Sequence, residues 1–280
     1  MKIIFFGTPE YVMPVLKRLH REHEIVAVVT QPPSEVGREK KVKRTEVDHW
    51  AYKRKIPIFF DFGKPLPAAD LGVLAAYGKI IPKDVILNTK YGIFNIHPSL
   101  LPKYKGASPV QAAITNGEQT TGVTIIKMDE KLDHGPILSS FREDINPDDT
   151  TGSLRERLFQ RSAQFVVDLI PNYLSGKIKS KKQDHAKAAF TKVLKREDGF
   201  IDAERFTSEA RKVERLIRAM QPWPGAWTYV NLGQNLKKRL KILQAHLENG
   251  KLLLDKVQLE GKTPVSFEEF KRGYPDFEFS

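Results

Sequence analysis

The sequence predicts an α/β protein in which a doubly wound, mostly parallel sheet is followed by a small β-barrel domain. The chain opens with an apolar strand at 2–6, apolar residues at helical spacing over 12–19, and a second apolar strand at 25–30. This order is typical of a βαβ unit, with which Rossmann-like sheets begin. The last third instead holds short strand-like runs separated by Gly233 and Asn249-Gly250, which indicates an OB-like barrel.

The turn after the first strand leads directly into the first helix. Thr8 is placed to cap this helix, with Pro9 as its first residue. The turn lacks the G-x-G-x-x-G spacing, so a dinucleotide site is not expected. Further strands are predicted over 56–60, 71–76, 92–96, 123–126 and 137–141, and helices over 47–55, 108–116, 150–174 and 207–220.

A run of cations follows the second strand, within residues 31–46. No apolar residue recurs there at the period of a strand or a helix, so the segment is predicted to be an exposed, mobile loop. A solvated charge run without a partner is the alternative interpretation. The cations of interest are Arg38, Lys40, Lys41, Lys43 and Arg44.

Composition narrows the class of protein. The 280 residues carry a net charge of +12, which suggests a polyanionic partner such as nucleic acid, with a generally lysine-rich composition as an equal alternative. Cysteine is absent and no apolar run reaches transmembrane length, so a soluble, cytoplasmic protein without membrane contact is expected. Residues 177–196 are lysine-rich with few large apolar side chains, which is typical of a linker. The predicted domains are therefore 1–178, a basic linker at 179–202, and 203–280.

One strand carries two polar residues of catalytic type. Asn95 and His97 are two residues apart, so both side chains point to the same side of the strand, and Pro98 ends the ladder. The pair lies at the carboxyl end of the strand, where open α/β sheets bind ligands. Asp133 follows the strand at 123–126 in a turn closed by Gly135, so an amide, an imidazole and a carboxylate could converge. Taken singly, an ordinary hydrogen-bonded histidine and a turn-forming aspartate remain alternatives.

The string from Asn95 to Asp133, including the Gly106-Ala-Ser-Pro-Val-Gln111 pattern, resembles the 10-formyltetrahydrofolate-dependent formyltransferase family. The resemblance implies that Asn95, His97 and Asp133 are catalytic and that no metal is needed. It also implies a folate-binding loop and an adjoining Ala-Tyr-Gly turn that lines the folate pocket. The residues so implied are Tyr77, Gly78, Ser99, Leu100, Leu101 and Pro102.

Within that family the chain is most similar to the methionyl-tRNA formyltransferases. The Gly-Arg-x-Lys-Lys core of the cationic segment, the stretch 218–224 and the ending 262–270 carry this similarity. It implies formyl transfer from 10-formyltetrahydrofolate to initiator methionyl-tRNA for translation initiation, with the cationic segment and the barrel binding the tRNA and the enzyme acting as a monomer. A sugar-nucleotide N-formyltransferase is the alternative, since it shares the catalytic residues. Stand-alone purine-pathway formyltransferases would leave 200–280 unexplained.

The resemblance implies a role for each catalytic side chain. Asn95 donates to the oxyanion, His97 shares that role or accepts the amine proton, and Asp133 orients His97 or relays the proton. The sequence leaves these proton roles open. Two residues depart from the family pattern beside the aspartate, where Lys131 and His134 replace a glycine and a small or hydroxyl residue.

Overall fold

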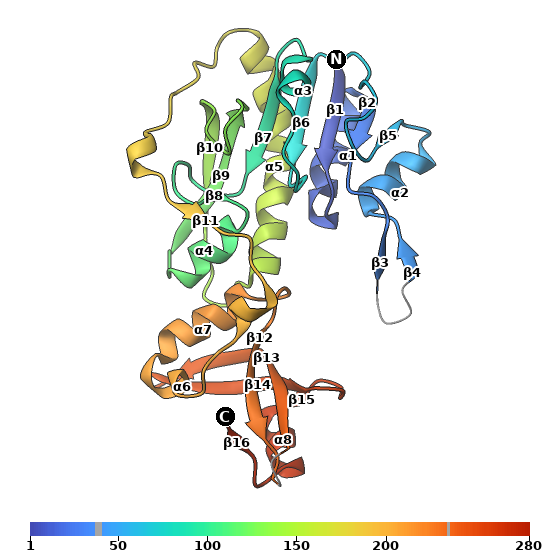
Figure 1. Ribbon diagram of the computed structural model, residues 1–280. Helices are drawn as coiled ribbons and strands as arrows, with labels where there is room; N and C mark the ends of the chain where they lie inside the picture. The colour runs from blue at the N-terminus through green and yellow to red at the C-terminus, as the bar shows by residue number, and fades with distance from the viewer. Residues whose placement is uncertain (37–40, 234–235) are drawn as a thin grey trace. The chain divides into compact units, whose positions relative to one another are not determined.

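The computed structural model describes residues 1–36, 41–233 and 236–280, which form two compact units (Figure 1). The first unit comprises Met1–Ala107, Thr120–Asp144 and Arg155–Thr191, and the second comprises Ser108–Gln119, Ile145–Leu154 and Lys192–Ser280. Two internal segments therefore belong with the carboxy-terminal part of the chain. The assignment of 1–178 to catalysis and 203–280 to tRNA binding stays a prediction.

The first unit is built on a seven-stranded sheet with the order β10-β9-β7-β6-β1-β2-β5. Five neighbouring strands are parallel, whereas β9 is antiparallel to β7 and β10 is antiparallel to β9. The doubly wound, mostly parallel sheet is confirmed. The strands are β1 (Lys2–Gly7), β2 (Glu24–Val29), β5 (Ile58–Phe59), β6 (Leu71–Ala75), β7 (Ile93–His97), β9 (Thr120–Lys127) and β10 (Ile137–Asp144).

The strand order creates a switch point between β1 and β6. From β1 the chain proceeds to β2 and β5 on one side, and then returns to β6 and β7 on the other. Strands β1 and β7 are almost wholly buried, which is why they are continuous apolar runs in the sequence. Ligands of open α/β sheets bind outside the carboxyl ends of strands at such a point, and β7 ends there beside β6.

Thr8 does not cap the first helix, so that prediction is wrong. A 3-10 turn at Glu10–Val12 intervenes, and α1 (Met13–Glu22) begins after Val12 without a side-chain cap. The Thr8 hydroxyl instead donates to the Tyr77 carbonyl oxygen at 3.2 Å and accepts from the Gln31 amide at 3.2 Å. It ties together the three segments that follow β1, β2 and β6. The other helices of this unit are α2 (Glu46–Lys53) and α3 (Lys83–Leu87), and α5 (Thr151–Leu174) begins in the second unit and continues in the first.

The cationic segment is not the irregular loop that was predicted. Its described part forms a two-stranded antiparallel hairpin of β3 (Ser34–Val36) and β4 (Lys41–Lys43), in which Ser34 pairs with Lys43. Ser34, Val42 and Lys43 are exposed, in agreement with the predicted exposure. An exposed strand needs no apolar alternation, so the hydrophobic pattern did not reveal the hairpin.

The segment after α5 is also more ordered than a linker. Residues up to Thr191 belong to the first unit, where β11 (Phe190–Thr191) pairs in parallel with β8 (Lys105–Gly106). A 3-10 turn at His185–Lys187 precedes this pair. The contacts are backbone hydrogen bonds, which lysine-rich sequence does not exclude, so composition alone misassigned 179–191.

The second unit carries a five-stranded antiparallel sheet with the order β15-β14-β13-β12-β16. The predicted Asn249-Gly250 turn joins β13 to β14, and both strands are longer than predicted. The predicted helix at 207–220 is broken at Glu209 into two pieces. The elements are β12 (Ala226–Asn231), β13 (Lys237–Glu248), β14 (Lys251–Leu259), β15 (Val265–Ser266), β16 (Glu278–Phe279), α4 (Pro109–Thr115), α6 (Arg205–Ser208), α7 (Ala210–Ala219), α8 (Phe267–Gly273) and a 3-10 turn at Arg196–Gly199.

Within the described ranges, none of the helices is both long and apolar enough to cross a membrane.

Candidate active site

Strand β7 carries Asn95 and His97 near its carboxyl end, inside the sheet. It is hydrogen-bonded on one side to β6 and on the other to β9, so its backbone is fixed along its length. The side chains are 7% and 5% exposed, respectively. Because they are two residues apart on a strand, they lie on the same face, as the sequence predicts.

Asp133 reaches the same place from the turn between β9 and β10. Its backbone is left-handed, with φ of 46°, and its side chain is buried. The turn is tight, since a Cβ on Gly135 would collide with the carbonyl oxygen of Lys127. A non-glycine residue in this conformation is strained and requires support from its surroundings.

The three predicted catalytic side chains converge on the Asp133 carboxylate. The Asn95 Nδ2 donates to Oδ1 at 3.0 Å, and the Gly106 amide donates to Oδ2 at 2.8 Å. The Nδ1 of His97 lies 3.6 Å from Oδ2, which is beyond hydrogen-bond distance but close enough for electrostatic attraction of an imidazolium. The carboxylate is thus held by two charge-assisted hydrogen bonds beside an imidazole.

The surroundings of His97 select its tautomer. Its Nε2 lies 2.9 Å from the carbonyl oxygen of Tyr104, and a carbonyl oxygen only accepts, so Nε2 carries a proton. In the neutral ring the lone pair is therefore on Nδ1, which faces Asp133. This arrangement leaves Nδ1 as the nitrogen that can take up a proton and form an imidazolium next to the carboxylate.

Asp133 also sets the direction of the Asn95 amide. A carboxylate only accepts, so Nδ2 rather than Oδ1 of Asn95 must face it. The amide nitrogen has a second hydrogen, which has no other partner among the described residues. That hydrogen is available to a ligand, as an oxyanion donor has to be.

The predicted folate loop is the turn that leaves β7. The Thr124 hydroxyl of β9 donates to the Ser99 carbonyl oxygen at 2.7 Å and accepts from the Leu101 amide at 3.1 Å. The Ser99 hydroxyl donates to the Lys103 carbonyl oxygen at 2.7 Å. Ser99 to Pro102 are thus brought next to Asn95 and His97 and held there from β9.

The predicted turn at Tyr77 and Gly78 leaves β6 beside the switch point. The Tyr77 carbonyl oxygen accepts bonds from Thr8 and from the Gln31 side chain, both at 3.2 Å, so it is already engaged within the protein. Burial raises the pKa of the Tyr77 phenol, with Asp61 adding to the effect. Gly78 has a φ of 83°, and a Cβ there would meet nothing closer than 3.9 Å. The turn therefore offers space beside Gly78 for a ligand.

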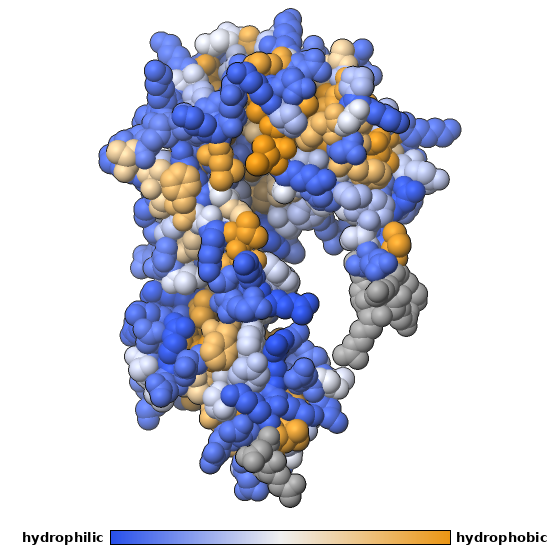
Figure 2. Space-filling view, viewed as in Figure 1, coloured by the Kyte–Doolittle hydropathy of each residue, from blue (hydrophilic) through white to orange (hydrophobic). Residues whose placement is uncertain are grey.

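An apolar surface adjoins these loops. Ile80 is 90% exposed and Leu132, next to Asp133, is 64% exposed. Lys83 and Glu130 form an ion pair at 2.6 Å that links the segments carrying these two side chains. Figure 2 shows hydrophobic residues gathered over the β1 and β6 region of this unit, within a largely hydrophilic surface. Such a surface fits the flat aromatic body of a folate.

The hairpin cations are placed only in part. Arg38 and Lys40 lie outside the described residues, as does the side chain of Lys41. Lys43 is exposed. Arg44 is engaged within the protein: its guanidinium lies 3.1 Å from a carboxylate oxygen of buried Asp48 and 4.5 Å from the ring centre of Tyr52.

The sequence did not predict that polar residues of the segment after α5 lie around the Asp133 turn. The Gln183 side chain is buried and donates to two carbonyl oxygens of the Asp133 turn. The Nζ of buried Lys105 lies 3.2 Å from the His185 Nδ1, and burial lowers the pKa of Lys105 while Asp133 and Asp129 oppose that shift. These partners are 48 or more residues apart in sequence, so spacing gives no sign of them.

The departure at His134 also has a structural role. Its Nδ1 lies 2.6 Å from a carboxylate oxygen of Asp129, and its ring stacks on His185 with centroids 3.9 Å apart. Lys131 lies in the same turn, where its amide donates to the Asp129 side chain at 3.0 Å. Both departures are accommodated without displacing Asp133 from Asn95.

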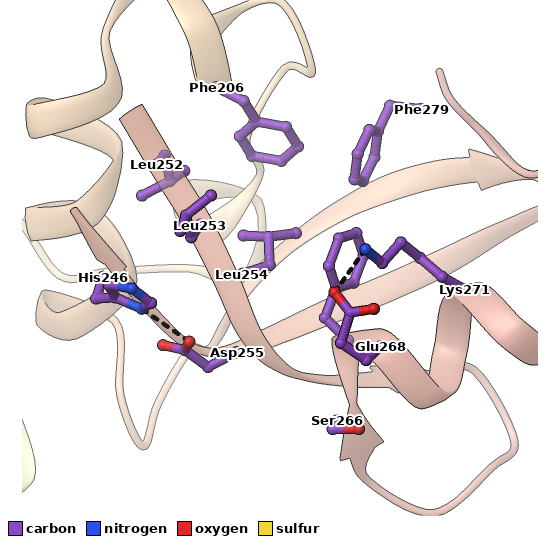
Figure 3. A pocket seen from close by; sticks show the side chains of 11 residues that line it. Phe206, His246, Leu252, Leu253, Leu254, Asp255, Ser266, Glu268, Lys271 and Phe279 are labelled. Atoms are coloured by element: carbon purple, nitrogen blue, oxygen red, sulfur yellow. Dashed lines mark hydrogen bonds and ion pairs between the residues drawn. The ribbon is translucent and has the colours of Figure 1, made fainter. Parts of the chain in front are cut away.

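A separate cavity of about 430 Å³ lies in the second unit (Figure 3). Leu252 and Leu254 of β14 line it together with Phe206 and Phe279, and its polar side chains are paired with one another. His246 lies 2.8 Å from Asp255, and Lys271 lies 2.6 Å from Glu268. It contains none of the predicted site residues. Within the described ranges, no cluster of three or more histidine, aspartate or glutamate side chains could hold a metal ion.

Two protein families match this chain. The family described as "Formyl transferase" matches residues 1–170, and that described as "Formyl transferase, C-terminal domain" matches residues 193–251. A methionyl-tRNA formyltransferase from Roseiflexus sp. (strain RS-1) is 37% identical over an alignment of 308 positions, which covers 98% of this chain and 92% of the relative.

Solved structures share the fold at lower identity. A methionyl-tRNA formyltransferase from Clostridium thermocellum has a TM-score of 0.58 and 20% identity, with 92% of this chain and 98% of that chain covered. An N-formyltransferase from Helicobacter canadensis, in complex with folinic acid and dTDP-3-aminofucose, has a TM-score of 0.68 and 18% identity, with 95% and 98% covered. At these identities the likeness concerns the fold alone.

Proposed function

The chain belongs to the methionyl-tRNA formyltransferase family, and from this premise we propose that it formylates initiator methionyl-tRNA. The formyl donor is 10-formyltetrahydrofolate and the acceptor is the amino group of the methionyl moiety. The observation that carries the proposal is the convergence of Asn95 and His97 on the Asp133 carboxylate. The reaction serves translation initiation.

The chemical step begins when the neutral amine attacks the formyl carbon and the carbonyl oxygen becomes an oxyanion. The second N–H of Asn95 donates to this oxygen, because the first is fixed by Asp133. A positioned donor of this kind typically lowers the barrier by roughly 3 kcal/mol. Asp133 thus contributes to oxyanion stabilisation indirectly, by orienting the amide.

His97 moves the proton. Its unprotonated Nδ1 takes a proton from the amine nitrogen after attack, and the resulting imidazolium is stabilised by the Asp133 carboxylate 3.6 Å away. The proton can then pass to the tetrahydrofolate nitrogen as its bond to the formyl carbon breaks. The products are the formylated amine and tetrahydrofolate, and the imidazole returns to its neutral form.

We infer that folate binds in the first unit. Ser99, Leu100, Leu101 and Pro102 lie beside the catalytic strand, and Tyr77 and Gly78 lie at the switch point. The N-formyltransferase from Helicobacter canadensis, which shares the fold, is in complex with folinic acid, and this supports a folate ligand. The donor is a co-substrate, and the chemistry assigned here to Asn95, His97 and Asp133 is carried by protein groups alone.

We further propose that the tRNA contacts the hairpin cations and the domain at 203–280. Arg38, Lys40, Lys41, Lys43 and Arg44 place positive charge beyond β2, within a chain whose net charge is +12. Cations of this kind bind phosphates and release counterions. The protein acts in the cytoplasm as a monomer. Sedimentation of the purified chain tests the monomeric state directly.

The experiment that tests the function is a choice of acceptor. The protein is supplied with 10-formyltetrahydrofolate and either methionyl initiator tRNA or an amino-sugar nucleotide, and formylation of each is followed by mass spectrometry. Formylation of the tRNA alone is expected. Formylation of the sugar nucleotide alone would contradict the proposal and favour the sugar-nucleotide reading instead.

A further inference from the structure

Residues 181–191, which we call the strap, are fixed to the first unit along their length. Lys181 and Ile137 exchange two backbone hydrogen bonds, both at 2.8 Å. Further along, the Lys105 amide donates to the Ala189 carbonyl oxygen at 2.8 Å, and β11 then pairs with β8. The strap is therefore part of the structure around the candidate active site.

Gln183 of the strap holds the turn that presents Asp133. Its side chain is 7% exposed, and its Nε2 donates to the Asp133 carbonyl oxygen at 2.9 Å and to the Gly135 carbonyl oxygen at 2.7 Å. Asp133 has a left-handed backbone, which costs a non-glycine residue about 1–3 kcal/mol and persists only when the surroundings enforce it. The two bonds from one amide hold the backbone that directly follows this residue, from its own carbonyl group to that of Gly135.

The other end of the strap pairs with the segment whose backbone amide binds the carboxylate of the same residue. The Gly106 amide donates to the Asp133 Oδ2, and Gly106 belongs to β8, which pairs with β11. The Thr191 hydroxyl donates to the Lys105 carbonyl oxygen at 2.9 Å. A Cβ on Gly106 would lie 2.6 Å from the Thr191 carbonyl oxygen, so the two segments are in close contact. The strap thus supports Asp133 at its backbone and at its side chain.

A glutamine at position 183 reduces the stability of the fold unless the hydrogen bonds that its amide donates compensate. The Oε1 atom of Gln183 is buried and lacks a hydrogen-bond partner among the described residues. An unpaired buried acceptor costs about 1–3 kcal/mol, a cost that an apolar side chain of similar size would avoid. What glutamine provides here, and an apolar residue cannot, is the pair of bonds to the Asp133 turn.

We propose that Gln183 is a positioning residue for formyl transfer, which with the strap holds the Asp133 carboxylate where it meets both Asn95 and His97. This inference rests on the proposed function for its kinetic consequence. Without Gln183 the turn relaxes, so Asn95 loses its fixed direction and the His97 imidazolium loses its close counter-charge. Gln183 acts only through Asp133 and does not touch the reacting atoms.

The first test compares two glutamine-to-methionine variants of the full chain. Gln183→Met preserves size but removes both donors, and it should lower kcat about 10- to 100-fold with KM for tRNA and folate nearly unchanged, as a displacement of about 1 Å does. The matched control is Gln164→Met. Gln164 of α5 also donates through its side-chain amide, to a carboxylate oxygen of Asp168 at 2.7 Å, but it lies on the exposed surface of the helix. The control should keep kcat, and equal kcat for Gln183→Met and the parent would overturn the proposal.

A pH series on Gln183→Glu separates positioning from packing. An ionised glutamate would repel the two carbonyl oxygens, whereas its protonated form can donate one bond, and burial shifts the carboxyl pKa upward. From about pH 8 to about pH 5.5, kcat of Gln183→Glu should therefore rise relative to Gln183→Met. A constant ratio would mean that the side chain only fills space.

Hydrogen exchange decides the proposal independently of the reaction. The Gly106 amide and the amides of the Asp133 turn should exchange faster in Gln183→Met than in the parent, and not in Gln164→Met. Unchanged exchange would overturn the strap's role. An inactive parent with this exchange pattern would instead refute the proposed function and leave the positioning of Asp133 supported.

Discussion

The buried cluster of Asn95, His97 and Asp133 differs from the cations of the β3–β4 hairpin in the geometry that its role requires. In the cluster, each side chain is more than nine-tenths buried and has a specific partner, so small displacements matter. Lys43 of the hairpin is exposed, and a cation of this kind attracts phosphate without a fixed geometry. The difference predicts that changes to the cluster alter the rate of the chemical step, whereas changes to the hairpin alter affinity and its salt dependence.

The largest effect is expected from Asp133→Ala. The change removes the counter-charge of His97, frees the Asn95 amide and leaves the Gly106 amide without its acceptor, so kcat should fall about 10³-fold or more. Single-turnover formylation measures this loss. Asp144→Ala, at an exposed aspartate of β10, is the control and should stay near the parent rate. Near-normal turnover of Asp133→Ala would remove that residue from the mechanism.

A smaller, salt-dependent effect is expected from the hairpin. Replacing Arg38 and Lys41 by alanine should weaken tRNA binding and flatten the log–log dependence of affinity on salt by roughly one to two units. Folate affinity should barely change, because the folate residues lie elsewhere. The measurement is a salt titration of charged-tRNA affinity, with Lys17→Ala, at an exposed lysine of α1, as the control. Identical slopes in parent and double variant would make the segment a solvated charge run.

Arg44 differs from Lys43 in that its side chain is engaged within the protein. Its guanidinium pairs with Asp48, whose side chain is fully buried, so Arg44→Ala should lower the free energy of unfolding by about 1–2 kcal/mol. Lys43→Ala should leave stability unchanged and flatten the tRNA salt slope by about 0.7–0.9 units. Urea unfolding and the same salt titration test the pair. Equal stability of the two variants would mean that the Arg44–Asp48 pair does not stabilise the fold and that Arg44 acts in tRNA binding alone.

The smallest expected effect concerns acid pH. Burial lowers the pKa of His185, and His134 and Lys105 lower it further, while Asp129 opposes them and Lys131 adds to the lowering. The unfolded chain therefore binds more protons than the folded chain just below the ordinary histidine pKa, so stability falls as pH drops through about 6.5.

Urea midpoints at about pH 7.5 and about pH 5.5 measure this loss. His185→Gln should lose less stability across that interval than the parent, since glutamine stays neutral and can still accept from Lys105. Burial also lowers the pKa of His23, so His23→Gln serves as the comparison for a histidine away from the strap. The same loss in His185→Gln and in the parent would contradict the assignment to His185.

The two regions also differ in how far the sequence predicts them. The buried strands are continuous apolar runs, and the two-residue spacing of Asn95 and His97 gives their shared face directly. Spacing alone does not predict the contact between Asp133 and Asn95, because this contact depends on how the β9–β10 turn folds. The resemblance to formyltransferases supplied that link, and the structure brings the side chains within 3.0 Å.

There is a physical reason why the sequence does not predict the strap. Its main attachments are backbone hydrogen bonds, such as those between Lys181 and Ile137, and any residue other than proline can make them. Gln183 bonds to carbonyl oxygens about 50 residues away, which no local pattern encodes. The hairpin was not predicted for a similar reason, since its described side chains, such as those of Val42 and Lys43, are exposed.

The central claim is that the buried cluster performs the chemistry and the hairpin binds the tRNA. Single-turnover formylation at increasing protein concentration separates a limiting rate from a half-saturating concentration. Asn95→Ala should reduce the limiting rate about 10²- to 10³-fold and leave half-saturation near that of the parent. The Arg38→Ala/Lys41→Ala variant should raise the half-saturating concentration and keep the limiting rate. The reverse assignment, with the hairpin controlling the rate and Asn95 controlling the affinity, would contradict the account.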